Sequence, residues 1–375
     1  MGKCLVTKLN GVVDNSSILR IGEMRLYVDK VDSPNANTQG FAIAVNKPVT
    51  LKILSDGYFT NESLTNNLGT TITLDKSNPN VFVSNNNVEI AIWDKYSIIS
   101  MTSYYTTGTG NYAKNKRFDI EGLKYSADLS ELIYSNSQVF GNLENLSNLT
   151  KLVSLRIGNS NIEGDIKALS RLSSLTSIVL PISTYGDISA FAEISGLTMI
   201  DCTGSSISGD LKNLSNLLKL NTIKMYATNV NGDINSLSNL AELQYFYAPN
   251  TNGDVASLSG LNKLKEFSSA NSSIIGDLSK VPSNCYLFEV ANYKGNGFTW
   301  SSRPSSSNIF AIQGSPKIEN IDKMLQDLAQ CNAAIPSTGE TFYKKISAIG
   351  TRTPASDAAV QTLQSKGYTV SIIPV

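Results

Sequence analysis

The strongest constraint on the fold of this chain is a tripeptide, Gly-Asp-aliphatic, that recurs at almost constant intervals. The separations between copies are 23, 23, 22, 23, 23, 21 and 23 residues when two looser copies at the start of the series are included. Chance does not maintain such spacing, so we expect a stack of similar structural units in the middle of the chain. The copies begin at Phe118, Gly141, Gly164, Gly186, Gly209, Gly232, Gly253 and Gly276.

Two periods alternate within each unit. Leu214, Leu217 and Leu220 are three residues apart, which is typical of a short helical turn. Leu220, Ile223 and Met225 then follow the spacing L-x-x-L-x-L, so the period changes to that of a strand. Each unit is therefore predicted to be a coil with one strand and one helical segment. With Gly-Asp-Ile in its G-x-I place, the motif resembles the plant-type subclass of leucine-rich repeats, and the resemblance covers residues 118–315.

The resemblance implies an α/β leucine-rich repeat solenoid, right-handed, with parallel strands and short helical segments. A coil can bury its leucines only against the next coil, so the apolar strand positions should point inward. Cys202 takes the last inward place of its strand, and we expect it to be buried and reduced. The other residues expected inside are Leu152, Leu155, Leu175, Ile178, Leu197, Ile200, Leu220, Ile223, Leu243 and Phe246.

One position departs from the family pattern. Leucine-rich repeats usually carry an asparagine after the strand, and these asparagines form a ladder of hydrogen bonds. Hydroxyl residues stand there in this chain, and a hydroxyl satisfies fewer backbone groups than a carboxamide does. We therefore expect a weaker ladder. The positions are Ser160, Ser183, Ser205, Thr228, Thr251 and Ser272.

The two ends of the chain lack the repeat. Alternating β-type runs separated by turn signals predict an antiparallel β-sandwich for residues 1–105, followed by a linker at 106–117. Its expected strands are 41–45, 49–54, 70–74, 88–93 and 96–101, with an opening strand at 4–9. Residues 316–375 are predicted to form an α/β cap that extends the parallel sheet. Its expected elements are a helix at 318–329, a strand at 342–349, a helix at 357–365 with Ser356 as N-cap, and a strand at 368–373.

Tyrosines gather among the outward strand positions, which leucine-rich arrays expose on their concave face. A tyrosine offers large contact area at low entropic cost, so these positions form a candidate binding patch for a protein or a glycan. The alternative is that exposed strands favour tyrosine in any case. The candidate residues are Met199, Asp201, Lys224, Tyr226, Tyr245, Tyr247 and Tyr293.

Two groups of carboxylates invite other interpretations. The aspartates of the tripeptide form a column of the kind that can bind calcium, but an aspartate before a helical segment commonly caps it, and we favour capping. Glu266 and Glu289 lie on adjacent coils and resemble a glycosidase pair, although an open sheet face builds no cleft around them. We therefore expect no catalysis. The column consists of Asp165, Asp187, Asp210, Asp233, Asp254 and Asp277.

Composition excludes several classes of function. The chain contains no histidine, which excludes Ser-His-Asp and Cys-His catalysis and His-ligated zinc. Its four cysteines form no C-x-x-C pair, so we expect unpaired thiols, no metal and no cofactor. A formal net charge of +0 gives no electrostatic basis for binding nucleic acid. We also expect no secretory signal and no membrane insertion, because apolar runs are short.

The terminal segments 1–11 and 350–360 resemble structural proteins of crAss-like phages of Bacteroidetes. This resemblance implies a virion protein, a fibre or capsid decoration, that is assembled in the bacterial cytoplasm and forms a homo-oligomer. Residues 1–105 would anchor it to other virion proteins, and the repeats would be displayed for a host-surface protein or glycan. Deleting residues 1–105 is expected to leave a folded, soluble array. The alternatives are a bacterial surface adhesin and a polysaccharide-degrading enzyme; the absence of histidine argues against the enzyme.

Overall fold

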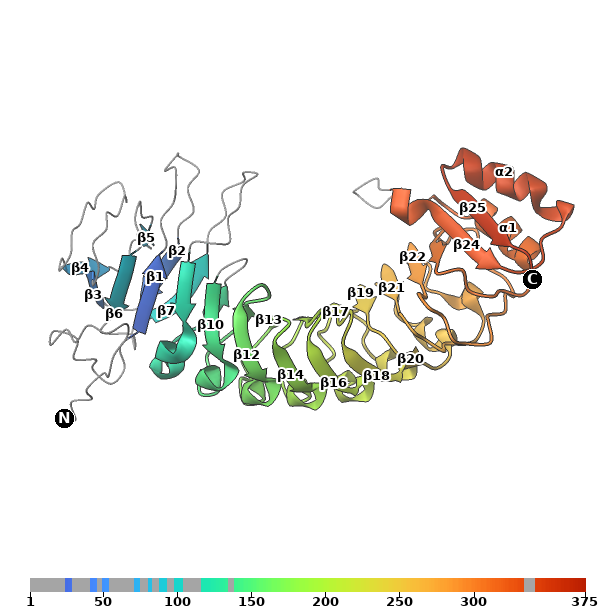
Figure 1. Cartoon of the computed structure of the whole chain (residues 1–375). Coiled ribbons are helices and arrows are strands. Elements are labelled where there is room, and N and C mark those ends of the chain that lie inside the picture. The colour runs from blue at the N-terminus through green and yellow to red at the C-terminus, as the bar shows by residue number, and fades with distance from the viewer. Residues whose placement is uncertain are drawn as a thin grey trace. The chain divides into compact units, whose positions relative to one another are not determined.

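The computed structural model describes residues 24–28, 41–45, 49–53, 71–74, 80–82, 88–92, 98–103, 116–133, 138–333 and 341–375. The chain divides into two compact units, Met1–Tyr185 and Gly186–Val375. Their strands and helices are labelled in Figure 1 where there is room. The predicted sandwich of residues 1–105 and the linker at 106–117 lie largely outside the described residues, as does the opening strand at 4–9. These domain limits, and the limits of 118–315 and 316–375, stay predictions.

Strands occupy all five β-type runs predicted near the amino terminus. Antiparallel pairing joins them in two sets, β1–β6–β3–β4 and β5–β2–β7. The sequence did not indicate β1 or β5. The strands are β1 (Met24–Val28), β2 (Phe41–Val45), β3 (Val49–Ile53), β4 (Thr71–Leu74), β5 (Asn80–Phe82), β6 (Val88–Ile92) and β7 (Ile98–Ser103).

The first coils continue both sets of strands without a break in pairing. β8 (Lys116–Asp119) pairs antiparallel with β1 and parallel with β10 (Gln138–Asn142). β9 (Glu131–Ile133) pairs parallel with β7. The remaining elements of this unit are β11 (Ser154–Arg156), β12 (Asn161–Asp165), β13 (Ser177–Val179), β14 (Thr184–Asp187) and the 3₁₀ helices η2 (Ile120–Tyr125), η3 (Leu143–Leu146) and η4 (Ile166–Leu169).

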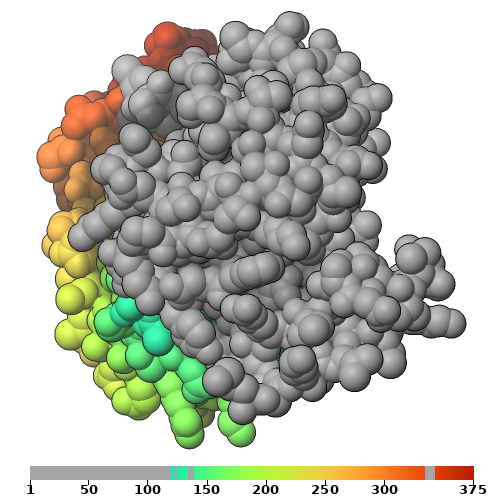
Figure 2. All heavy atoms as spheres, turned by 90° about the vertical axis from the view of Figure 1, so that its left-hand side faces the viewer, coloured from blue at the N-terminus to red at the C-terminus, as the bar shows by residue number. Residues whose placement is uncertain are grey.

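The second unit has one long row of parallel strands, each hydrogen-bonded to the next. In Figure 2 its coils follow one another in sequence order, from yellow-green to orange. This parallel row confirms the solenoid-like arrangement expected from the repeat. The strands are β15 (Met199–Asp201), β17 (Thr222–Lys224), β19 (Tyr245–Tyr247), β21 (Glu266–Ser268), β22 (Leu287–Glu289), β23 (Ala311–Gln313), β24 (Lys345–Ile349) and β25 (Thr369–Ile373).

Most coils contain a second strand, so the prediction of one strand per coil was wrong. The residues before each Gly-Asp alternate buried and exposed, as Ile207 and Val230 show, and this is the period of a strand. The second strands of this unit are β16 (Ser206–Asp210), β18 (Asn229–Asp233) and β20 (Thr251–Asn252). Its 3₁₀ helices are η5 (Ile188–Phe191), η6 (Leu211–Leu214), η7 (Ile234–Leu237), η8 (Val255–Leu258) and η9 (Leu278–Lys280).

The core lies between the two strand rows and the 3₁₀ helices of each coil. Every residue predicted to point inward is 0% exposed, and so is Cys202, which is a free thiol. In the later coils phenylalanine replaces the aliphatic residue in the middle of the strand. The rings of Phe246, Phe267 and Phe288 stack with centroid separations of 5.0 and 5.2 Å. The repeat period thus places large side chains in register through the stack.

In each Gly-Asp pair the aspartate caps a 3₁₀ helix and the glycine adopts a positive φ. The aspartate is the N-cap of the following 3₁₀ helix, and its carboxylate accepts a hydrogen bond from the backbone N–H two residues on, at 2.8 to 3.0 Å. Asn142 makes the same bond in an earlier coil, at 2.9 Å. The glycines have φ between +107° and +134°, a region that favours glycine. The predicted capping role of the aspartate column is confirmed.

Some of the hydroxyl positions close turns within their own coils, whereas Thr251 shares a hydrogen bond with Ser269 at 2.7 Å and the buried Ser272 hydroxyl has no partner among the described residues. The side chains of Ser205 and Thr228 each donate to the carbonyl three residues back, at 2.7 and 2.8 Å. One position was wrong by a residue, because Ser183 is exposed and Thr184 is buried in its place. The turn there closes on the carbonyl of Pro181, which shifts the buried hydroxyl by one residue.

The carboxy-terminal elements extend the parallel row as predicted, through β24 and β25. The helix predicted at 318–329 is α1 (Ile321–Gln330), which starts later because Ile318 pairs with Phe298 in a β-bridge. α2 (Asp357–Ser365) has the predicted bounds, but Ser356 does not cap it with its side chain. The Ser356 hydroxyl donates instead to Asp322 of α1, at 2.6 Å. Two 3₁₀ helices complete this region, η10 (Thr341–Lys344) and η11 (Pro354–Ser356).

Candidate functional site

The outward side chains of the second unit form two columns across the parallel strands. Cross-strand pairing aligns the first positions of successive strands with one another, and likewise the third positions. The first column is Met199, Thr222, Tyr245, Glu266 and Leu287. The second column is Asp201, Lys224, Tyr247, Ser268 and Glu289. We call this surface the strand face.

Tyrosine rings pack together in the middle of the strand face. The rings of Tyr226 and Tyr247 are tilted against each other with centroids 5.0 Å apart. The rings of Tyr286 and Tyr343 meet edge to face at 5.4 Å. We call these four residues and Tyr245 the tyrosine patch. Tyr286 directly precedes β22 and Tyr343 lies in η10, so the patch combines a strand region with the carboxy-terminal elements.

The buried Glu266 carboxylate is hydrogen-bonded to three tyrosines of the patch. It is only 6% exposed, although it occupies an outward position of β21. Its carboxylate accepts hydrogen bonds from the hydroxyls of Tyr247, Tyr286 (2.7 Å) and Tyr343 (3.4 Å). These bonds satisfy a buried charge and hold the three rings in fixed orientations.

Burial raises the pKa values of three tyrosines of the patch, Tyr226, Tyr247 and Tyr286. Burial, with smaller contributions from Glu289 and Glu266, raises the pKa of Tyr226 to about 12, although Ser268 acts in the opposite direction. Burial and the hydrogen bond to Glu266 raise the pKa values of Tyr247 and Tyr286 further. At neutral pH these side chains are therefore neutral hydrogen-bond donors.

Lysines lie over two of the rings. The Lys224 ammonium is 5.8 Å from the centre of the Tyr247 ring, and the Lys265 ammonium is 5.6 Å from that of Tyr245. Both distances are within the range of a cation–π contact. A groove of about 510 Å³ adjoins this edge of the patch and is lined by Tyr286 of the patch and by Lys265. The other residues lining the groove are Gln244, Asn262, Lys263, Asn284 and Asn308.

The structure brings together most of the residues predicted as the binding patch. Tyr226, Tyr245, Tyr247 and Lys224 are in contact or in adjacent register positions, and Met199 and Asp201 lie on β15, beside the strand that carries Lys224. Tyr293 is placed elsewhere. Its hydroxyl donates to the Ile274 carbonyl at 2.6 Å, and its ring stacks on Phe298 at 5.2 Å. Those contacts tie Tyr293 to the coil itself.

Sequence reasoning did not find Tyr286, Tyr343 or Lys265. Tyr286 and Lys265 directly precede strands, at positions that the strand alternation leaves undefined. Tyr343 is 77 residues from Glu266 and follows a different local pattern. The sequence places Glu266 and Glu289 at outward strand positions and suggests a possible catalytic pair, but it does not identify them as partners of the tyrosines and of Ser268. The tyrosine hydroxyls on Glu266 and the Ser268 hydroxyl on Glu289, at 2.7 Å, show instead what these carboxylates contact.

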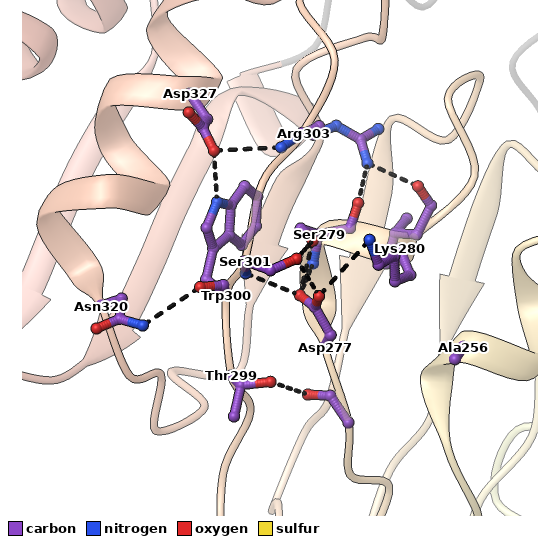
Figure 3. A network of polar contacts seen from close by, with 12 residues as sticks. Ala256, Asp277, Ser279, Lys280, Thr299, Trp300, Ser301, Arg303, Asn320 and Asp327 are labelled. Atoms are coloured by element: carbon purple, nitrogen blue, oxygen red, sulfur yellow. Dashed lines mark hydrogen bonds and ion pairs between the residues drawn. The ribbon is translucent and has the colours of Figure 1, made fainter.

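A second polar network lies near the carboxy-terminal elements and is structural (Figure 3). Asp327 of α1 accepts hydrogen bonds from the Trp300 indole at 2.9 Å and from the Arg303 backbone at 3.2 Å. The buried Arg303 guanidinium donates to carbonyls of the preceding coil, including that of Val281 at 2.6 Å, and stacks on Phe310. Asp277 accepts from Ser279 and Ser301. These contacts attach α1 to the coils.

The structure gives no sign of a metal or of a membrane segment where it describes the chain. No group of three or more histidine, cysteine, aspartate or glutamate side chains among the described residues is placed to hold a metal ion. The aspartates of the column are engaged as caps. No helix within the described ranges is long and apolar enough to cross a membrane.

Several solved leucine-rich repeat proteins align with this chain. An internalin (inlF) of Listeria monocytogenes has 20% identity over 70% of this chain and 82% of its own, with a TM-score of 0.48. Internalin C2 of the same species has 23% identity over 54% and 83%, with a TM-score of 0.40. An Arabidopsis thaliana receptor kinase ectodomain, GASSHO1/SCHENGEN3, has 18% identity over 68% and 34%, with a TM-score of 0.46.

No protein-family model matches the chain, and no curated protein matches it. The leucine-rich repeat arrangement therefore rests on the chain itself. Its support is the period of 21 to 23 residues, the L-x-x-L-x-L spacing and the parallel strand row.

Proposed function

We propose that this chain is a non-enzymatic binding protein that holds a protein ligand against the tyrosine patch. The observation that carries the proposal is the set of tyrosine rings oriented by hydrogen bonds to the buried Glu266. Rings held in place before binding lose little conformational entropy when a ligand arrives. Tyr226 remains 36% exposed, so a ligand can reach the patch.

The composition of the patch also favours a protein ligand. Protein interfaces are enriched in tyrosine, and an apolar ring with a polar tip can bind both apolar and polar groups of a partner. The groove of about 510 Å³ beside the patch is open rather than enclosed, unlike most small-molecule sites. A parallel row of rigid strands supports the rings from behind.

A display selection tests the proposal. A random peptide library is selected on the immobilised full chain, and each enriched peptide is then measured against variants. The double variant Tyr226→Ser/Tyr245→Ser should lose binding of most selected peptides. The matched control is Tyr185→Ser, because Tyr185 is 51% exposed and lies outside the patch. Equal binding by the double variant and the wild type would rule the patch out as the ligand surface.

We further propose that the chain acts in a bacteriophage virion, with residues 1–105 contacting other virion proteins. The resemblance of segments 1–11 and 350–360 to structural phage proteins supports this setting. Assembly would take place in the bacterial cytoplasm, and the repeats would face the host surface. Mass spectrometry of purified particles should find the chain at constant stoichiometry with the capsid protein. Detection only in the bacterial envelope fraction would support the adhesin alternative instead.

A further inference from the structure

We infer that the ligand segment bound by the tyrosine patch carries an arginine, which stacks on Tyr226 and pairs with Glu289. This inference rests on the proposed function and specifies the chemistry of its ligand. It follows from the distribution of charges and rings on the strand face, where some groups already have partners and others do not.

The carboxylates of the patch have hydroxyl partners but no cation. Glu266 contacts tyrosine hydroxyls, and Glu289 accepts a hydrogen bond from Ser268. The salt bridges among the described residues include neither glutamate. Neither glutamate therefore has a cationic partner within salt-bridge distance in the described part of the chain, and Glu289 is the more exposed of the two.

The lysines on and beside the strand face already contact aromatic rings of the patch. Lys224 lies over the Tyr247 ring and is the cross-strand neighbour of Asp201, and Lys265 lies over the Tyr245 ring. Tyr226 has no such cation over its ring in the part of the chain that the structure describes. The Tyr226 ring and the Glu289 carboxylate, which lie near each other, thus both lack a cationic partner among the described residues.

Geometry places these two groups on one binding spot. The Tyr226 ring packs on Tyr247, and strand pairing places Ser268 between Tyr247 and Glu289. The Glu289 carboxylate accepts a hydrogen bond from the Ser268 hydroxyl at 2.7 Å, and both residues also influence the pKa of Tyr226. A guanidinium can stack on an aromatic ring while donating two parallel hydrogen bonds to a carboxylate. An ammonium has neither the planar stacking surface nor the two parallel donors of a guanidinium, and an acidic side chain would be repelled. Charge and shape therefore select arginine.

The experiment uses the selected peptides described above. Those that require the tyrosines are sequenced, and arginine should be enriched over lysine, aspartate and glutamate. Glu289→Gln keeps the size and the Ser268 contact of the side chain and removes its charge. The Glu289→Gln substitution should lower the affinity for the tightest-binding arginine peptide about ten-fold or more. Replacing that arginine with citrulline, its neutral analogue, should weaken binding to the wild type by a similar factor and have little effect in Glu289→Gln.

The matched control is Glu242→Gln, because Glu242 pairs with Lys263 at 2.7 Å outside the patch. This variant should bind the peptide as the wild type does. Tyrosine-dependent peptides without arginine, or binding unchanged in Glu289→Gln, would overturn the inference and leave the proposed function intact. A selection in which no peptide depends on the tyrosines would overturn both.

Discussion

The aspartate of the preceding coil occupies the space that a Cβ on the glycine of most Gly-Asp pairs would need. A Cβ built on Gly232 would lie 2.7 Å from the Asp210 carboxylate and 2.9 Å from the Leu211 nitrogen. The same conflict recurs at Gly209, where the nearest atom belongs to Asp187. The two residues of the motif are therefore coupled between coils, which explains why they repeat together.

Gly232→Ala is predicted to destabilise the protein by about 1–3 kcal/mol. Its φ of +134° is strained for any residue with a Cβ, and the nearby backbone nitrogen of Leu211 cannot move aside cheaply. Urea unfolding monitored by circular dichroism measures the loss. Gly260→Ala is the control, since an added Cβ there meets nothing within 4 Å and should change stability little. Equal effects of the two substitutions would contradict the coupling.

At the scale of the element, each short 3₁₀ helix depends on its cap. These helices have at most one turn of internal hydrogen bonds, so the capping carboxylate contributes a large part of their local stability. Asp254 accepts from the Ala256 N–H at 2.8 Å, and the following coil packs against the same carboxylate through Gly276.

Asp254→Ala is therefore predicted to cost about 0.5–2 kcal/mol, and Asp254→Asn much less. An amide oxygen can accept the same N–H bond, as Asn142 does in an earlier coil. Thermal unfolding of both variants at neutral pH measures the difference. If asparagine were as harmful as alanine, the negative charge rather than the cap would be the essential property.

The carboxy-terminal helices respond to acid through their aspartates. Burial acts to raise the pKa values of Asp322 and Asp327, but hydrogen bonds from Ser356 and Thr353 to the first, and from Lys323 and Trp300 to the second, outweigh it and lower both. Because the folded pKa lies below the usual carboxyl value of about 3.9, the unfolded chain binds more protons in between. The stabilisation is present above that pH and is lost below it.

Unfolding midpoints in urea should thus be nearly constant above about pH 5 and fall as the pH drops below about 4. Asp322→Asn should flatten part of this fall, because it removes one titrating group. Glu319→Gln serves as the control, since Glu319 is exposed and has no side-chain partner among the described hydrogen bonds. A stability that rises on acidification would refute the assignment.

At the scale of the whole molecule, strand pairing changes an expectation drawn from the sequence. A separable sandwich would leave a folded array after deletion of residues 1–105. The strands of that region, however, are hydrogen-bonded to the first coils, β1 to β8 and β7 to β9. Deletion would remove these partners and leave strand edges open, and open edges promote association between chains.

We therefore predict that the chain lacking residues 1–105 aggregates or forms oligomers that the full chain does not form. Size-exclusion chromatography with light scattering distinguishes these outcomes. A monomeric truncated chain with an unchanged unfolding midpoint would show that the amino-terminal strands do not support the coils.

Several features of the site could be predicted from local pattern and others could not. The inward positions of Leu220 and Ile223 followed from the repeat, because period alone decides which face a strand residue takes. The outward positions of Tyr245 and Tyr247 followed in the same way. The prediction that Ser183 holds the buried hydroxyl position was wrong, because one proline shifts the turn by a residue. Tyr293 is held by a stacking partner that no repeat position specifies.

The sequence by itself determined the coil, its period, its core and the capping role of its aspartates, because each depends on residues close together or on an exact repeat. Only the tertiary structure decided that Glu266 is buried beneath tyrosines. Tyr343 reaches Glu266 from 77 residues away, through η10 rather than through a repeat. Such a contact depends on how the chain returns to the strand face. Periodicity says nothing about that return, so the character of the candidate site emerged only from the fold.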